Sequence, residues 1–131
     1  MHNLFKKLTL FGVIIIMVTA FACGGRFEGN KYGDDRMLHM DFTVFDCTEE
    51  YELTVTTDEW LSVGISTVRG SLSVKICAEN GEEIYSGNGL TCEEFSVAVP
   101  EDGKYTVFIT GESAKGEINF VIEPQDSGEE E

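Results

Sequence analysis

Histidine is the side chain most often used for proton transfer near neutral pH, and this chain has only two, His2 and His39. His2 lies in an N-terminal segment that we expect to be removed, which leaves His39 as the single histidine of the mature protein. His39 stands at a polar position of an alternating segment and has no obvious catalytic partner in the sequence. G-x-S-x-G and H-E-x-x-H motifs are also missing. We therefore predict that the protein is not an enzyme and has no catalytic residue.

Four cysteines offer a second kind of chemistry, and their spacing argues against redox or zinc sites because no C-x-x-C is present. Cys77 and Cys92 both fall at outward-facing positions of their segments. A disulfide between them would close a loop of about 15 residues and contribute about 3 kcal/mol. Such a bridge is typical of an exported protein, but it leaves Cys47 as an odd third cysteine outside the disulfide. Three reduced thiols, Cys47, Cys77 and Cys92, are the alternative.

Carboxylates are abundant, since 24 Asp and Glu stand against 9 Lys and Arg and the formal net charge is −15. This charge repels nucleic-acid phosphates, so we exclude a nucleic-acid partner. Calcium takes six to eight oxygen ligands, but no D-x-D-x-D-G run organises the acids. We expect a solvated acidic surface, with Ca²⁺ as the alternative and its ligands unknown. The acids fall largely in pairs: Asp34-Asp35, Asp46 with Glu49-Glu50, Asp58-Glu59, Glu82-Glu83, Glu93-Glu94 and Glu101-Asp102.

Aromatic side chains provide the remaining candidates for a binding surface. Trp60 and Phe108 stand at outward-facing positions of alternating segments, and Tyr85 lies in a short apolar pair. An exposed aromatic strip of this kind serves sugar-binding or partner-binding surfaces, so Trp60, Tyr85 and Phe108 are the predicted ligand-facing residues. The alternative is structural, with Trp60 covering a sheet edge and Phe108 pairing across strands.

The segments that carry these residues alternate apolar and polar positions with a period of two, which indicates strands buried on one face. Turn signals separate them, notably Asn80-Gly81 and Pro100-Glu101-Asp102-Gly103. About eight short antiparallel strands need a second sheet to cover them, so we predict an all-β, two-sheet β-sandwich of jelly-roll or Greek-key type, with a closed barrel as the alternative. The apolar sets lie in residues 38–44, 51–55, 61–65, 72–76, 84–85, 95–99, 105–109 and 118–122.

Residues 1–22 have the three parts of a secretory signal peptide. Lys6 and Lys7 form the positive start, an apolar run follows over 8–18, and small residues lead to Ala22. The apolar stretch of about 15 residues is short of the ~20 that a membrane-spanning helix needs. Removal of this segment leaves 109 residues (131 − 22) with a charge of −17 (7 cations against 24 acids).

Ala20-Phe21-Ala22-Cys23 resembles the lipobox of bacterial lipoproteins. The resemblance implies that Cys23 becomes the N-terminus, receives a diacylglyceryl group and anchors the protein to the extracytoplasmic face of the bacterial cell membrane. Most members of that family have Leu where this chain has Ala20, and Phe21 replaces a small residue. An ordinary A-x-A cleavage, which would leave Cys23 as a plain thiol, is the alternative.

The mature chain then divides into three parts by composition. Residues 23–36 contain four glycines and no apolar period, which favours a lipidated Cys followed by a flexible tether; an N-terminal strand with Phe27 and Tyr32 docked on the domain is the alternative. Residues 37–123 form the β-sandwich domain. Residues 124–131 are expected to be an acidic, disordered tail.

The sequence Pro100-Glu101-Asp102-Gly103-Lys104-Tyr105-Thr106-Val107 is similar to a step in secreted sandwich domains of the pre-peptidase C-terminal type, and the wider pattern over residues 50–122 looks like a group of small bacterial lipoproteins. Such domains are non-catalytic, and some assist secretion or bind polymers or calcium. The resemblance implies an anchored, non-enzymatic binding or accessory module with a protein or glycan partner at the cell surface. A carbohydrate-binding module and a calcium-stabilised structural module are the alternatives.

Overall fold

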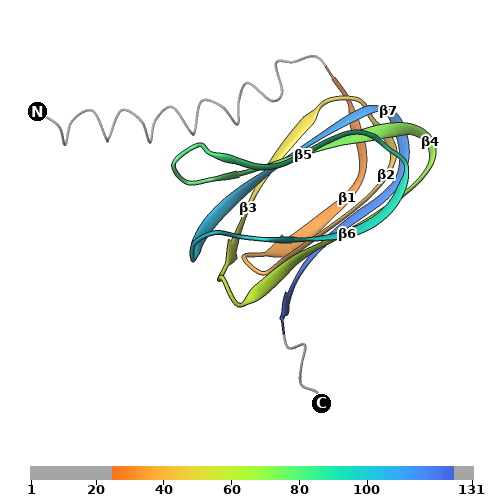
Figure 1. The fold of residues 1–131 in the computed structure, drawn as a ribbon. Coiled ribbons are helices and arrows are strands. Elements are labelled where there is room, and N and C mark those ends of the chain that lie inside the picture. The colour runs from red at the N-terminus through yellow and green to blue at the C-terminus, as the bar shows by residue number, and fades with distance from the viewer. Residues whose placement is uncertain (1–24, 126–131) are drawn as a thin grey trace, which may run out of the picture.

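The computed structural model describes residues 25–125, and the regular structure within that range consists of seven antiparallel strands (Figure 1). The predictions for the signal peptide, Cys23 and residues 126–131 lie outside the described residues. The strands are β1 (Phe27–Asp34), β2 (Met37–Phe45), β3 (Thr48–Val55), β4 (Glu59–Ala78), β5 (Glu83–Leu90), β6 (Cys92–Ala98) and β7 (Gly103–Pro124).

Two long strands, β4 and β7, pass through both layers of the sandwich and connect them (Figure 1). In layer I the strand order is β1-β2-β7-β4-β6, formed by the second half of β7 and the first half of β4. In layer II the order is β3-β7-β4-β5, formed by the other halves. The predicted all-β antiparallel sandwich is therefore confirmed, as one hydrogen-bonded sheet folded over itself.

The core consists of the inward-facing positions of both layers. In β4, Leu61, Val63 and Ile65 are buried from layer I, and Leu72 and Ile76 from layer II. Positions 65 and 72 are an odd number of residues apart, so a regular strand would turn one set outward. Register shifts on both sides of Arg69 absorb the difference in parity and let both halves face the same core.

The bends in the long strands join four of the eight expected strands into two, and strand β1, outside the expected sets, brings the total to seven. Gly70 and Ser113 both have positive φ, 70° and 50°, and lie opposite one another where the chain changes layer. A Cβ at Gly70 would lie 2.3 Å from the Ser113 carbonyl oxygen, so this position requires glycine. The apolar sets at 61–65 and 72–76 thus belong to one bent strand, as do those at 105–109 and 118–122.

The expected tether over residues 23–36 is wrong for residues 27–34, which form strand β1 along the edge of layer I. Phe27 anchors it, because its ring packs edge-on against Phe45 with centroids 5.3 Å apart and tilts against Phe42 at 6.1 Å. Lys31 adds an ion pair to Glu49 at 2.6 Å. Most of β1 is exposed, so its residues carry no apolar alternation for the sequence to reveal.

The described chain begins and ends at opposite ends of the sandwich (Figure 1). At the N-proximal end, the Arg26 carbonyl accepts a hydrogen bond from the Asp46 amide at 2.8 Å. At the C-proximal end, the Gln125 amide donates to the Asp58 carbonyl at 3.0 Å. The N-proximal end comprises residues 25–28, 45–48, 67–71, 90–92 and 110–116, and the C-proximal end comprises residues 34–37, 56–59, 78–83, 99–104 and 123–125.

Candidate functional site

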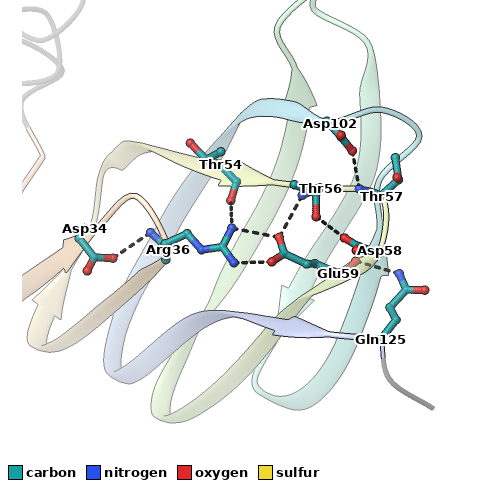
Figure 2. Close-up of polar contacts among 9 residues, drawn as sticks. All are labelled: Asp34, Arg36, Thr54, Thr56, Thr57, Asp58, Glu59, Asp102 and Gln125. Atoms are coloured by element: carbon teal, nitrogen blue, oxygen red, sulfur yellow. Dashed lines mark hydrogen bonds and ion pairs between the residues drawn. The ribbon is translucent and has the colours of Figure 1, made fainter. Parts of the chain in front are cut away.

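A polar network joins the loops of the C-proximal end (Figure 2). The Arg36 guanidinium forms a two-pronged ion pair with Glu59 and donates to the Thr54 carbonyl at 3.1 Å, while the Arg36 amide donates to Asp34 at 2.8 Å. The Glu59 carboxylate also accepts the Thr56 amide at 3.0 Å. These bonds link the β1–β2 turn to β3 and the start of β4, so the network is structural.

Glu59 has the most strongly shifted pKa among the acids of residues 25–125. Its hydrogen bonds from Arg36, followed in importance by those from Thr56, lower its pKa to about 2 despite the opposing effect of burial. In the same region, the Thr57 amide donates to Asp102 at 2.7 Å, and the Gln125 side chain donates to the Glu59 carbonyl at 2.8 Å. All the acids drawn in Figure 2 accept hydrogen bonds within the loops, which explains their clustering without a ligand.

His39 lies in a row of outward-facing residues that crosses all five strands of layer I. Both of its ring nitrogens face acceptors: Nδ1 faces the Asn119 side-chain oxygen, and Nε2 faces Asp41 at 3.1 Å. The Tyr32 ring packs over it at a centroid distance of 5.1 Å. The hydrogen bond with Asn119, with that to Asp41, raises the His39 pKa. Both nitrogens are thus engaged, which leaves neither open to a substrate. The row is Tyr32, His39, Asn119, Gly64 and Glu94.

A shallow groove of about 350 Å³ lies beside this row on layer I. Gly64 lines this groove, and the space where its Cβ would be is open, with no atom within 4 Å. Ser62 lies in the groove and bonds to Ser96 at 3.1 Å and to Glu123 at 3.2 Å. Within its lining the only aromatic ring belongs to Phe95, which comes from an inward-facing position.

A larger groove, of about 500 Å³, lies on the outer face of layer II around Phe108. In the strand register Phe108 lies between Glu50 of β3 and Lys75 of β4, and the Lys75 ammonium stands 5.2 Å above the centre of the ring. One wall includes Thr48 and Thr110, whose hydroxyls are hydrogen-bonded at 2.9 Å. The groove therefore combines an aromatic floor with hydroxyl, amide and charged groups; its other lining residues are Ser73, Val74, Glu83, Ser86 and Asn88.

The three aromatics predicted to face a ligand are not brought together. Trp60 is 37% exposed on layer I, opposite Ala98 and Glu123. Phe108 lies on the opposite outer face of the sandwich. Tyr85 is paired with the buried Ile76 and stacks on Phe95 at 4.7 Å, so it fills space between the layers. Phe108 lines the groove on layer II, and within residues 25–125 the expected aromatic strip does not form.

The possible Cys77–Cys92 disulfide is not formed in the structure, where both residues are free thiols, as in the alternative of reduced cysteines. Cys77 pairs with Glu83 near the β4–β5 turn, whereas Cys92 follows β5 and pairs with Ser66. The length of β5 therefore separates the two thiols, one at each end of the sandwich. Cys47 lies at the N-proximal end, where its sulfur is 3.7 Å from the Arg26 carbonyl oxygen.

Neither a metal centre nor a membrane-spanning helix is found in residues 25–125. That range contains no group of three or more His, Cys, Asp or Glu side chains placed to hold a metal ion. It likewise contains no helix with the length and apolar character to cross a bilayer.

The sequence did not identify Lys75 or Arg36 as site residues. Lys75 sits at a polar position of an alternating strand, and only the register with β7 places it over Phe108. Arg36 falls in the segment expected to be a tether, and its partner Glu59 is 23 residues away. Both roles depend on which distant strands pair, and local composition does not reveal that pairing.

No protein-family model and no curated protein matches this chain. Among solved structures it is similar to PliG of Aeromonas hydrophila, a periplasmic inhibitor of g-type lysozyme, with 20% identity and a TM-score of 0.48 over 72% of this chain and 93% of that one. It is also similar to a CBM4 structure, with 15% identity and a TM-score of 0.42 over 78% and 79% of the two chains. The xylan-binding module CBM86 of Roseburia intestinalis shows 12% identity and a TM-score of 0.36 over 74% and 82%. These likenesses carry no argument about ligand or activity, and the strand pairing of the chain itself establishes the antiparallel β-sandwich.

Proposed function

We propose that this protein is an extracytoplasmic lipoprotein, anchored through Cys23, whose β-sandwich serves as a non-enzymatic binding module. The signal-like residues 1–22 and the lipobox-like Ala20-Phe21-Ala22-Cys23 support the location and the anchor. The engagement of both His39 nitrogens supports a role without acid–base catalysis.

The observation that carries the binding role is the groove around Phe108. Ligand sites combine an apolar surface with a few placed polar groups, and this groove has one aromatic ring beside Thr48, Thr110, Ser73 and Asn88. A sugar fits this chemistry, since its apolar face stacks on a ring while its hydroxyls bond to neighbouring side chains. A glycan is therefore the ligand class that we propose.

Lys75 is the group that a stacked ligand has to displace. Its ammonium covers the Phe108 ring at 5.2 Å, a contact that contributes about 0.5–1 kcal/mol at an exposed site. Because the side chain is exposed and has four rotatable bonds, it can swing aside and donate to a ligand hydroxyl.

The test compares Phe108→Ala with Trp60→Ala, two aromatic truncations on opposite outer faces. Calorimetric titration with soluble xylan, β-1,4-galactan and peptidoglycan fragments measures binding. We expect at least one probe to bind, Phe108→Ala to weaken it by about tenfold or more, and Trp60→Ala to leave it unchanged. Absence of binding to every probe, or equal loss in both variants, contradicts the glycan proposal.

The anchor has a separate test. Wild-type protein and a Cys23→Ala variant, both expressed in a bacterium that processes lipoproteins, are compared by detergent phase partitioning. We expect wild type in the detergent phase and the variant in the aqueous phase, since two acyl chains give stable membrane association. Equal partitioning of the two proteins would contradict lipidation.

A further inference from the structure

The bend of β4 presents an apolar residue to solvent at the N-proximal end. Register shifts on both sides of Arg69 place Val68 at the tip of the bend, where 75% of its surface is exposed. The positive φ of Gly70 and the hydrogen bond from the Thr67 amide to the Thr91 carbonyl at 2.7 Å hold the bend in this form. Among the large apolar residues of the described chain, Val68 is the most exposed.

Two cations come next to this exposed residue in the strand register. Arg69 and Lys115 are direct partners in the β4–β7 register, an arrangement of like charges that is destabilising by itself. Neither forms an ion pair within residues 25–125. An external anion at this place would offset their repulsion.

The chain enters the domain at the same end. Gly25 packs so closely on the backbone of Asp46 that a Cβ would lie 2.2 Å from its carbonyl oxygen. Cys23 is two residues before Gly25, and two residues extend at most about 7 Å. Since β1 takes up the residues expected to form a tether, a lipid on Cys23 holds the N-proximal end against the headgroups.

The charge of the two ends differs in the direction that this orientation requires. The N-proximal end has three cations against three acids, and the C-proximal end has two cations against ten acids. An anionic membrane surface repels the second end and tolerates the first. The N-proximal charges are Arg26, Arg69, Lys115, Glu28, Asp46 and Glu112.

We propose that the N-proximal end is a membrane-contact surface, in which Val68 enters the interfacial layer and Arg69 and Lys115 bind the phosphates of anionic phospholipids. This proposal rests on the anchor proposed above and adds a fixed orientation. The C-proximal end then points away from the membrane. The grooves on the outer faces of layers I and II open sideways, parallel to the membrane plane.

Tryptophan fluorescence tests this orientation, because Trp60 is the only tryptophan and lies toward the C-proximal end. The mature lipidated protein is reconstituted into vesicles of phosphatidylcholine and phosphatidylglycerol that contain brominated lipid. In a Val68→Trp, Trp60→Phe variant we expect about twofold quenching of the new tryptophan. The Trp60 of the wild type should stay unquenched. Val68 is outside the core, so the variant is expected to fold, which far-UV circular dichroism checks.

Charge variants and flotation separate the outcomes. In the same tryptophan background, Arg69→Glu with Lys115→Glu should abolish most of the quenching, whereas Lys75→Glu, a cation on layer II, should leave it intact. A protein that floats with the vesicles but whose new tryptophan is unquenched, or equally quenched in both charge variants, overturns the contact surface alone. A protein that fails to float overturns the anchor and the contact surface together.

Discussion

At the scale of single residues, Arg36 connects more segments than its neighbours do. Its amide bonds to Asp34, its guanidinium reaches Thr54 and Glu59, and its carbonyl accepts the Ile122 amide at 3.2 Å. The main chain of Arg36 thus contacts β1 and β7, and its side chain contacts β3 and β4; Figure 2 shows the side-chain contacts. Its 44% exposure means that solvent screens the ion pair, which limits the contribution to stability.

Glu59→Gln tests this network through its pH dependence. The folded pKa of Glu59 is about 2, below its ordinary value of 4.5, so its contribution is present above pH 4.5 and disappears as the pH falls toward 2. We expect the variant to lose about 1 kcal/mol of unfolding free energy at pH 7, measured with urea, and to match wild type near pH 2. Glu52→Gln, an exposed acid on β3, is the control and should lose little at either pH. A deficit for Glu59→Gln that is the same at both pH values would contradict the ion-pair explanation.

At the scale of elements, the long strands β4 and β7 determine the architecture, because each contributes to both layers. Their bends need backbone conformations that residues other than glycine do not readily adopt. Gly116 has a φ of 152°, and a Cβ there would lie 2.2 Å from the Ser66 carbonyl oxygen. Gly64, in a straight part of β4, has open space where its Cβ would be.

Gly116→Ala and Gly64→Ala form a matched pair. The first should lower the unfolding free energy by about 1–3 kcal/mol, because the backbone must move to relieve the clash with Ser66. The second should change it by less than about 0.5 kcal/mol, or raise it slightly through reduced freedom of the unfolded chain. Urea unfolding of both variants measures the difference, and equal destabilisation would show that the bend is not the cause.

At the scale of the whole molecule, the dominant quantity is the excess of acid. A net charge of −15 opposes compaction, and ionic strength weakens that opposition. The distribution also matters, since the acids concentrate at the end of the sandwich that is farther from the N-terminus of the described chain. The orientation proposed above for an anionic surface depends on this asymmetry.

Salt dependence distinguishes screening from a specific calcium site. We expect the melting temperature to rise by a few degrees between low and moderate ionic strength, and equally for CaCl₂ and MgCl₂ at matched ionic strength. Both divalent cations screen alike, whereas a dedicated calcium site would discriminate between them. A larger rise with calcium that chelator removes would indicate such a site.

Much of the fold could be predicted from alternation alone, and the errors have identifiable causes. The sets at 61–65 and 72–76 were correctly expected to be buried, but their joining into β4 depends on a bulge that pairs Arg69 with Lys115. The sequence favoured a tether over strand β1, because Phe27 is the only residue of β1 that packs on the core. At the candidate site, the outward-facing position of Phe108 in the alternating pattern predicts its exposure. The groove around it could not be predicted, since Thr48 and Lys75 come from other strands.

The amino-acid sequence alone indicated which faces are buried, because successive side chains on a strand point in turn to water and to the core, whichever strand is the partner. It also determined the excess of acid and the order of the predicted parts along the chain. Which residues share a surface depended on the folded arrangement of the strands. Strand register separated Cys77 from Cys92 and Trp60 from Phe108, and placed Val68 beside two cations at the end where the chain enters. Register arises from backbone hydrogen bonds between strands far apart in the sequence, so no local pattern contains it.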